Sequence, residues 1–377
     1  MDILARARAL ERDGRDIIHM EIGEPDFATP VPVVEAGIRA LRAGHTHYTT
    51  ALGLPALREA ISNFYQQRDG ITVVPTRIVI TPGASGALQL ALALLLNPRD
   101  EVLLADPSYP CNRQLVRLAG GTAVLMPVDS VSGFQPTAEQ VRAAWSPRTS
   151  ALLLASPANP TGTLIAPTAL RAVWEEVERC NGALIMDEIY QGLVYDQATP
   201  SALVLSERVL VVNSFSKYFG MTGWRLGWLV APEEAVPYLD RLAQNLFLSA
   251  STPAQHAALA AFTPETLAIL DDRRREFARR RDYLVAALQT LGFSVPTVPG
   301  GAFYVYADCS PFGDSGQLAL SLLEQAGVAV TPGGDFGYHR AAEYLRFTYT
   351  TSMAHLEEGV ARLRHHLTGA VRGLGDR

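Results

Sequence analysis

Residues 211–225 read Val211-Val-Asn-Ser-Phe-Ser-Lys-Tyr-Phe-Gly-Met-Thr-Gly-Trp-Arg225. The stretch starts inside an apolar, β-branched run, Val209 to Val212, which predicts a short buried strand. A second apolar run, Leu226 to Val230, follows directly after the stretch. Lys217 is therefore expected on a loop at the end of a strand, between two elements that would bury it.

Burial would give this lysine a chemical use. An ammonium group removed from water tends to lose its proton, and a neutral lysine attacks aldehydes to form a Schiff base. Ser214, Ser216 and Arg225 place anion-binding groups beside it. An amine next to an anion site suggests an aldehyde that carries a phosphate, namely pyridoxal phosphate. Taken alone, Lys217 would be an ordinary solvated lysine, so the hypothesis depends on the rest of the chain.

Length and composition limit the classes of protein to consider. The 377 residues exceed one ordinary core and suggest two domains, and 48% hydrophobic with 19% charged residues indicates a globular chain. The net charge is -6. The basic runs at 273–275 and 279–281 alternate with acidic residues, which is typical of a solvated helix face. No nucleic-acid partner is expected.

The expected compartment is the cytosol. Cys111, Cys180 and Cys309 are scattered and odd in number, which fits a reducing environment and no disulfide framework. The first residues lack the apolar core of a signal peptide, and no apolar run reaches membrane-spanning length. Neither a membrane partner nor a metal site is expected.

The order of elements predicts an α/β fold with two domains. From residue 76 short, non-alternating apolar strands alternate with helices, which favours a mainly parallel sheet covered by helices on both faces. After Pro253 the pattern changes to a long helix at 264–291, an alternating strand at 303–306 and further short elements. We predict a large cofactor-binding domain at 45–265, and a smaller α+β domain made of 1–44 and 266–377.

Polar motifs follow four of the expected strands. In parallel α/β sheets ligands bind beyond the carboxyl ends of the strands, and each motif falls at that end. The motifs are Thr81-Pro-Gly-Ala-Ser-Gly86, Asp106-Pro-Ser-Tyr-Pro110, Ser156-Pro-Ala-Asn-Pro-Thr-Gly162 and Asp187-Glu-Ile-Tyr190. The first opens a helix at Gly83-Ala84-Ser85, whose free N–H groups would bind an anion, although many strand-to-helix turns are rich in glycine.

Three of these side chains have both a functional and a structural interpretation. Asp187 would hold a pyridinium nitrogen protonated, or it would cap a helix. Tyr190 would donate its hydroxyl to a phenolate oxygen, or it would be a core aromatic residue. Asn159 would contact the same oxygen, or it would serve the turn that Asn-Pro-Thr-Gly predicts.

Three further residues suggest how a ring and a substrate are held. Tyr109 would stack on a flat ring or simply pack. Arg346 lies in an apolar strand, where it would bind a substrate carboxylate or form an internal salt bridge. Gly23 would let a backbone N–H group reach the same carboxylate.

Together these residues resemble the fold type I pyridoxal-phosphate enzymes, specifically the class I/II aminotransferases, which are aspartate aminotransferase-like. The resemblance covers nearly the whole chain, from Glu21-Ile-Gly-Glu-Pro-Asp26 to Arg346. Its centre is Ser214-Phe-Ser-Lys217 with Arg225, joined by the Asn159 and Asp187 motifs in the family's order and spacing.

The resemblance implies a role for each matched position. Lys217 would form the Schiff base and then move the substrate proton. Asp187 would pair with the ring nitrogen, Asn159 and Tyr190 with the phenolate oxygen, and Tyr109 would stack on the ring. The phosphate would be bound by Gly83, Ala84, Ser85, Ser214, Ser216 and Arg225.

The resemblance also implies the substrates and the assembly. Arg346, with Gly23 and Asn159, would take the substrate carboxylate. An L-amino acid and a 2-oxo acid would react in turn by a ping-pong mechanism. Tyr48 matches the tyrosine that reaches the phosphate of the partner subunit, so a homodimer with shared sites is expected. Family members usually carry a further N-terminal segment, and its lack here leaves open how the site is closed.

Two other functions are alternatives to transamination. A cysteine-conjugate carbon–sulfur β-lyase on the same scaffold would keep Lys217, Asp187 and Arg346, and release of ammonia would distinguish it. A transcription regulator would need a helix-turn-helix extension and a basic patch, and the sequence shows neither. Arg113 and Arg117 are candidates for binding an acidic substrate side chain, although a solvated helix face is the simpler interpretation.

Overall fold

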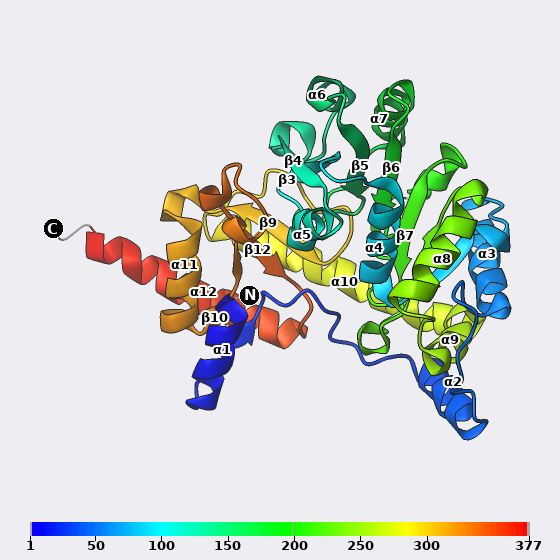
Figure 1. Cartoon of the computed structure of the whole chain (residues 1–377). Helices are drawn as coiled ribbons and strands as arrows, with labels where there is room; N and C mark the ends of the chain where they lie inside the picture. The colour runs from blue at the N-terminus through cyan, green and yellow to red at the C-terminus, as the bar shows by residue number, and fades with distance from the viewer. Residues whose placement is uncertain (1, 198, 375–377) are drawn as a thin grey trace.

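A seven-stranded sheet forms the centre of the larger of two lobes, on the right in Figure 1, in a computed structural model that describes residues 2–197 and 199–374. The strand order is β2-β8-β7-β6-β5-β3-β4. The strands are β2 Ile78–Thr81, β3 Glu101–Asp106, β4 Thr122–Pro127, β5 Thr149–Ala155, β6 Ala183–Asp187, β7 Leu210–Ser214 and β8 Gly227–Val230.

The mainly parallel sheet predicted from the sequence is confirmed. Strands β4, β3, β5, β6 and β7 run parallel, whereas β8 pairs antiparallel with both β7 and β2. The connection from β7 to β8 carries no crossover helix, so the chain turns back and lies antiparallel beside the strand that it has just left. Lys217 lies on this connection.

Helices cover both faces of the sheet, as expected for non-alternating strands. Leu184 and Met186 of β6 belong to one apolar cluster, and Ile185 to the cluster on the opposite face. The first cluster includes residues of α3 Pro55–Asp69, α6 Ala138–Ala144, α7 Pro167–Arg179 and α9 Thr252–Leu259. The second includes residues of α4 Gly83–Leu95, α5 Pro110–Leu118 and α8 Val236–Leu246.

Three of these helices, α6, α8 and α9, were not predicted. Helix α6 has a sequence signal, because Thr137 and Gln140 form a capping box around its first turn. Helix α9 is short and rich in alanine, so its sequence shows little contrast between a buried and an exposed face. Its place is set by packing against α2 Val31–Arg42.

The smaller lobe combines two small sheets with helices, as Figure 1 shows on the left. Strands β11, β12 and β9 pair antiparallel, and β1 pairs parallel with β10. Its strands are β1 Ile18–His19, β9 Tyr304–Asp308, β10 Val328–Ala329, β11 Thr331–Pro332 and β12 Tyr344–Thr348. Its helices are α1 Asp2–Arg12, α11 Ser315–Ser321, α12 Met353–Leu374 and the long α10 Pro264–Thr290, which joins the lobes.

The domain boundaries remain a proposal: 45–265 for the large domain, and 1–44 with 266–377 for the small one. Helix α2 falls in the second group by number but packs against α9 of the larger lobe. The segment before α2 therefore passes from one lobe to the other.

Among the residues that the structure describes, no helix has the length and apolar character needed to cross a bilayer.

A histidine ties α1 to the first strand of the small lobe. His19 Nδ1 lies 2.7 Å from Glu21 Oε1, and its Nε2 lies 3.0 Å from Glu11 Oε1 of α1. The hydrogen bond to Glu21 contributes most to a raised pKa of His19, with Glu11 adding to it. The protonated ring donates to both carboxylates.

We expect His19→Gln to lower stability more at pH 6 than at pH 8.5. The pKa of His19 is raised on folding, so its contribution is fully present below the unfolded pKa of about 6.5 and is lost as pH rises through the folded pKa. Urea denaturation of both proteins at the two pH values measures the difference. A difference in unfolding free energy that does not change with pH would contradict the charged bridge.

Candidate active site

Lys217 lies just after β7, where the sequence predicts it. Its side chain is half-buried, and Nζ donates to the carbonyl oxygen of Gly23 at 2.7 Å. The ring of Phe303 lies on another side, with its centroid 5.9 Å from Nζ. Burial lowers the pKa of Lys217 to about 8. About a tenth of this amine is therefore neutral at pH 7.

Asp187 ends β6, the strand next to β7, and is buried. Its Oδ1 accepts the N–H of Ile189 at 3.2 Å. Burial raises the pKa of Asp187 to about 6, against the opposing effects of the Ile189 hydrogen bond and of the charge of Lys217. No helix begins here, so the helix-cap interpretation is wrong. A buried carboxylate with so little compensation is suited to face a cation.

Arg346 on β12 meets Asn159 from the loop after β5. Its Nη1 donates to Asn159 Oδ1 at 2.9 Å, and its Nη2 donates to the Glu21 carbonyl oxygen at 2.6 Å. The guanidinium carbon lies 4.4 Å from the ring centroid of Tyr304 and 4.7 Å from that of Phe336.

This arginine is buried, yet its Nε has no hydrogen-bond partner in the described part of the chain. Its polar partners there are a main-chain carbonyl, an amide oxygen and the hydroxyl of Thr331, and none of them is a carboxylate. The internal salt bridge considered from the sequence is therefore not observed. A positive charge without an anionic partner is a suitable receptor for a carboxylate.

Tyr190 and Gly23 both lie against Tyr304, a residue that the sequence motifs did not predict in the site. The hydroxyl of Tyr190 lies 2.6 Å from the hydroxyl of Tyr304 on β9. A Cβ atom at position 23 would lie 2.6 Å from the same hydroxyl of Tyr304. Glycine is therefore required at 23 by this close approach, and its carbonyl oxygen accepts a hydrogen bond from Lys217. The contact of its N–H group with a substrate carboxylate stays a prediction.

The predicted anion-binding residues gather at the start of α4. Ser214 Oγ accepts the N–H of Ser216 at 3.0 Å, and Arg225 Nη1 lies 3.4 Å from Ser216 Oγ. A Cβ atom at Gly83 would lie 2.5 Å from Arg225 Nη2. The first turn of α4, which contains Ala84 and Ser85, has no side-chain cap. Uncapped N–H groups, two hydroxyls and a guanidinium form a cup that suits a phosphate.

Two tyrosines complete the predicted set. Tyr109, after β3, is half-buried, and its pKa is raised mainly by burial and next by the neighbouring Cys111. Tyr48 is on a surface loop of the larger lobe with 80% of its surface exposed.

Of the two arginines considered for an acidic substrate, Arg113 is the more constrained. Its Nη2 donates to the Asp335 carbonyl oxygen at 3.4 Å, and its guanidinium carbon lies 5.2 Å from the ring centroid of Tyr338. Arg117 is exposed on the same helix. Arg113 thus joins α5 to a loop of the small lobe, which the solvated-face interpretation did not predict.

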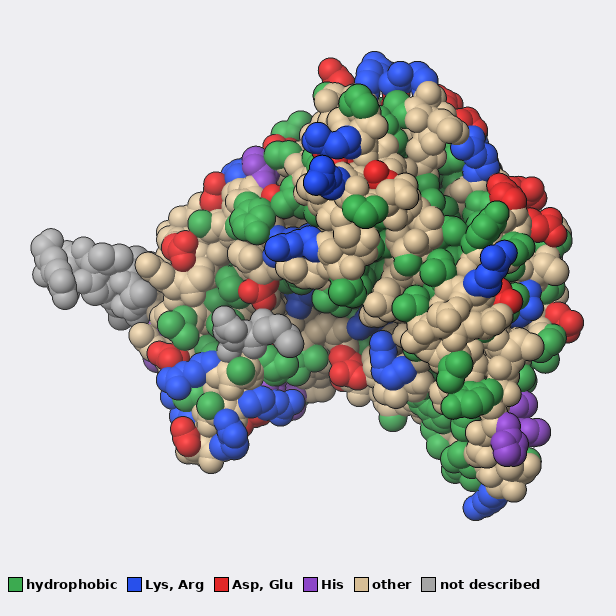
Figure 2. Space-filling model, in the orientation of Figure 1, with side chains coloured by type: hydrophobic (Ala, Val, Ile, Leu, Met, Phe, Trp, Pro, Cys, Tyr) green, Lys and Arg blue, Asp and Glu red, His purple; other side chains and the backbone are tan. Residues whose placement is uncertain are grey.

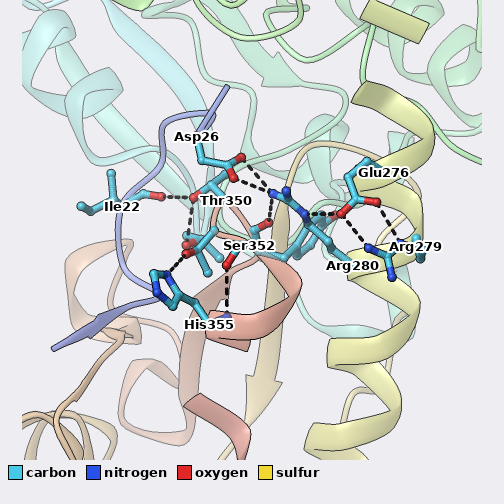
Figure 3. A network of polar contacts seen from close by, with 11 residues as sticks. Ile22, Asp26, Glu276, Arg279, Arg280, Thr350, Ser352 and His355 are labelled. Atoms are coloured by element: carbon cyan, nitrogen blue, oxygen red, sulfur yellow. Dashed lines mark hydrogen bonds and ion pairs between the residues drawn. The ribbon is translucent and has the colours of Figure 1, made fainter. Parts of the chain in front are cut away.

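A polar network fixes the segment that supplies Gly23 (Figure 3). Arg280 of α10 donates to both oxygens of Asp26, at 2.8 and 3.0 Å, and its Nε donates to Glu276 at 2.9 Å. Thr350 donates to the Ile22 carbonyl oxygen at 2.9 Å. The segment is thus held on both sides of Gly23.

We expect Arg280→Leu to lower the unfolding free energy by about 2–3 kcal/mol, because it leaves two carboxylates without their buried partner. The control is Arg279→Leu. Arg279 pairs with Glu276 too, but its side chain is 60% exposed, so its loss is expected to cost less than about 0.5 kcal/mol. Urea denaturation compares the two variants, and equal losses would contradict the role of burial.

The donor set fits pyridoxal phosphate in four places. The first is an amine with a lowered pKa, and the second is a buried carboxylate. The third is an uncapped helix start with hydroxyls and a guanidinium, and the fourth is a buried arginine whose Nε has no partner among the described residues. Figure 2 shows the molecular surface indented between the two lobes. These four places are complementary to an aldehyde, a ring nitrogen, a phosphate and a substrate carboxylate, respectively.

Comparison with known proteins identifies the family. The sequence profile described as aminotransferase class I and II matches residues 15–363. The chain belongs to this family. A valine–pyruvate aminotransferase from Mycobacterium tuberculosis is 40% identical over 366 residues, which cover 96% of this chain and 94% of that relative. A (5-formylfuran-3-yl)methyl phosphate transaminase from Methanocaldococcus jannaschii is 38% identical over 370 residues, covering 97% and 96%.

Solved structures agree with the fold. The aspartate aminotransferase of Thermus thermophilus, solved with maleate, superposes with a TM-score of 0.92 at 37% identity, covering 97% of this chain and 95% of that one. This chain is therefore a pyridoxal-phosphate-dependent aminotransferase of fold type I, as the sequence predicted. The relatives' names cite different amino-group donors and acceptors, so family membership leaves the substrate open.

Proposed function

We propose that this aminotransferase moves the amino group of an L-amino acid to a 2-oxo acid by a ping-pong mechanism centred on Lys217. The observation that supports it most is the half-buried Lys217, whose pKa is lowered to about 8, next to the buried Asp187. Lys217 would hold the aldehyde carbon of the cofactor. Gly83, Ala84, Ser85, Ser214, Ser216 and Arg225 would hold the phosphate.

When bound, pyridoxal phosphate supplies an electron sink for the electron pair left by the substrate's α-proton. Lys217 takes that proton at Nζ and later returns it, since an amine with a pKa near 8 both accepts and donates protons near neutral pH. Asp187 provides the negative charge opposite the ring nitrogen. Tyr190 and Asn159 offer hydrogen bonds to the ring oxygen, and Tyr109 offers its face to the ring.

Arg346 binds and orients the substrate carboxylate. Its buried, uncompensated charge favours an anion, and its flanking rings fix the plane of the guanidinium. Asn159, which already accepts from Arg346, would hold the same arginine in place. Gly23 contributes through its carbonyl contact with Lys217.

The exposed Tyr48 supports a homodimer in which each subunit completes the other's phosphate site. A large aromatic side chain that is 80% exposed in one subunit is suited to burial against a partner.

The proposed location is the cytosol, supported by three free cysteines, Cys111, Cys180 and Cys309.

The visible spectrum of the purified protein tests the proposal. With pyridoxal phosphate the protein is expected to turn yellow, to bleach when single amino acids are added without an oxo acid, and to regain its colour with a 2-oxo acid. The amino acids that bleach it fastest identify the substrate class. A protein that keeps its colour while releasing ammonia would be a β-lyase, and one that never turns yellow would contradict the role of Lys217.

A further inference from the structure

Tyr304 connects the groups that the proposed function assigns to the cofactor and to the substrate. Its hydroxyl lies 2.6 Å from that of Tyr190, and its ring centroid lies 4.4 Å from the guanidinium carbon of Arg346. Its hydroxyl also lies opposite Gly23, where only a missing side chain leaves room. The side chain of Tyr304 is fully buried, so these contacts are made without competing water.

The hydrogen bond between the two tyrosines has a direction that matters. Each hydroxyl carries one proton. If Tyr190 points its proton at an acceptor in the site, the bond between the two hydroxyls persists only when Tyr304 is its donor. The positive charge of Arg346 next to Tyr304 favours this arrangement, because it makes the phenol a stronger proton donor. Tyr304 thereby leaves the proton of Tyr190 free for the site.

The ring of Tyr304 has a second task. It lies on one side of the Arg346 guanidinium, and Phe336 lies on another, 4.7 Å away. Rings packed against a guanidinium hold its plane and attract its charge without neutralising it. The arginine therefore stays available for an anion. The hydroxyl of Tyr304 thus acts on Tyr190, and its ring acts on Arg346.

We propose that Tyr304 is a positioning residue of this aminotransferase: its hydroxyl directs the proton of Tyr190 into the site, and its ring holds Arg346 ready for the substrate carboxylate. This inference rests on the proposed function. It names a residue outside the motifs that connect Lys217, Asp187 and Asn159. Tyr304 acts through its neighbours and needs no contact with the reacting atoms.

The test is the pH titration of the visible absorption band of the holoenzyme. A hydrogen bond donated to an anionic oxygen of the chromophore stabilises its deprotonated form, so its loss raises the midpoint. Tyr190→Phe is expected to raise the midpoint most. Tyr304→Phe is expected to raise it by about half a pH unit, a threefold change in proton affinity. The double variant is expected to match Tyr190→Phe alone.

The matched control is Tyr349→Phe. Tyr349 is also fully buried in the small-lobe core, and its hydroxyl donates to the Ala302 carbonyl oxygen at 3.3 Å. Its removal is expected to leave the midpoint in place. The proposed role of the Tyr304 hydroxyl is wrong if Tyr304→Phe does not change the titration midpoint. It is also wrong if the double variant shifts the midpoint by the sum of the two single shifts.

The ring is tested separately by substrate kinetics. Tyr304→Phe keeps the ring and is expected to lower kcat with little change in KM for the amino acid. Tyr304→Leu is expected to raise KM about tenfold as well, within the range of a lost buried cation–π contact. Equal KM values for the two variants would overturn the role of the ring. If the unmodified protein never develops the visible band, the proposed function itself fails, which separates the two failures.

Discussion

Replacing Lys217 by alanine is expected to abolish amino-group transfer, with a fall in kcat/KM of more than about 10⁴-fold. Lys217 is placed to do two tasks. Its amine is partly neutral near pH 7, because burial lowers its pKa to about 8, and its Nζ is fixed by the Gly23 carbonyl at 2.7 Å. Alanine removes both the nucleophile and the proton carrier.

Lys217→Arg is the matching control. Arginine keeps the positive charge and the hydrogen-bonding capacity but stays protonated at all accessible pH values. We expect it to be as inactive as alanine, since the neutral amine is what the chemistry needs. Single-turnover bleaching of the visible band with an amino acid measures both variants. Substantial transaminase activity in either would contradict the assignment of Lys217.

Replacing Asp187 by asparagine is expected to lower kcat/KM by about 10³-fold while stabilising the protein without its cofactor. The charge is needed opposite a ring nitrogen, and asparagine of the same shape cannot supply it. Burial raises the pKa of Asp187 to about 6. An ionised Asp187 therefore weakens the folded state as pH rises from its unfolded value near 4 through 6, by about 2–3 kcal/mol at pH 7.

The neighbouring Glu188 provides the control. It is also buried, burial raises its pKa to about 7, and its Oε1 accepts the N–H of Ala202 at 2.6 Å. Glu188→Gln is expected to stabilise the cofactor-free protein in the same direction with little change in activity. Urea denaturation at pH 7 and steady-state kinetics separate the two effects. If both variants lose activity equally, the charge of Asp187 has no special role.

The sequence predicted the fold class because the parallel strands β3, β5, β6 and β7 are short and covered on both faces. Such strands give continuous apolar runs such as Val209 to Val212, and each run ends where a polar motif begins. The antiparallel course of β8 was not readable, since an apolar run has no direction in the sequence. Helix α9 was not predicted because its place depends on packing against α2 rather than on strong local periodicity. Helix α8 does have a clear helical periodicity in its sequence, which could have predicted it.

The sequence by itself determined which residues meet at the strand ends. Lys217, Asp187 and Asn159 follow neighbouring strands, and parallel strands bring their carboxyl ends to one edge of a sheet. Only the tertiary structure decided what holds them. Lys217 is fixed by Gly23, 194 positions away, and Tyr190 by Tyr304, 114 positions away. Contacts between residues so far apart in the chain form only when the two lobes pack together. Local sequence patterns therefore do not predict them.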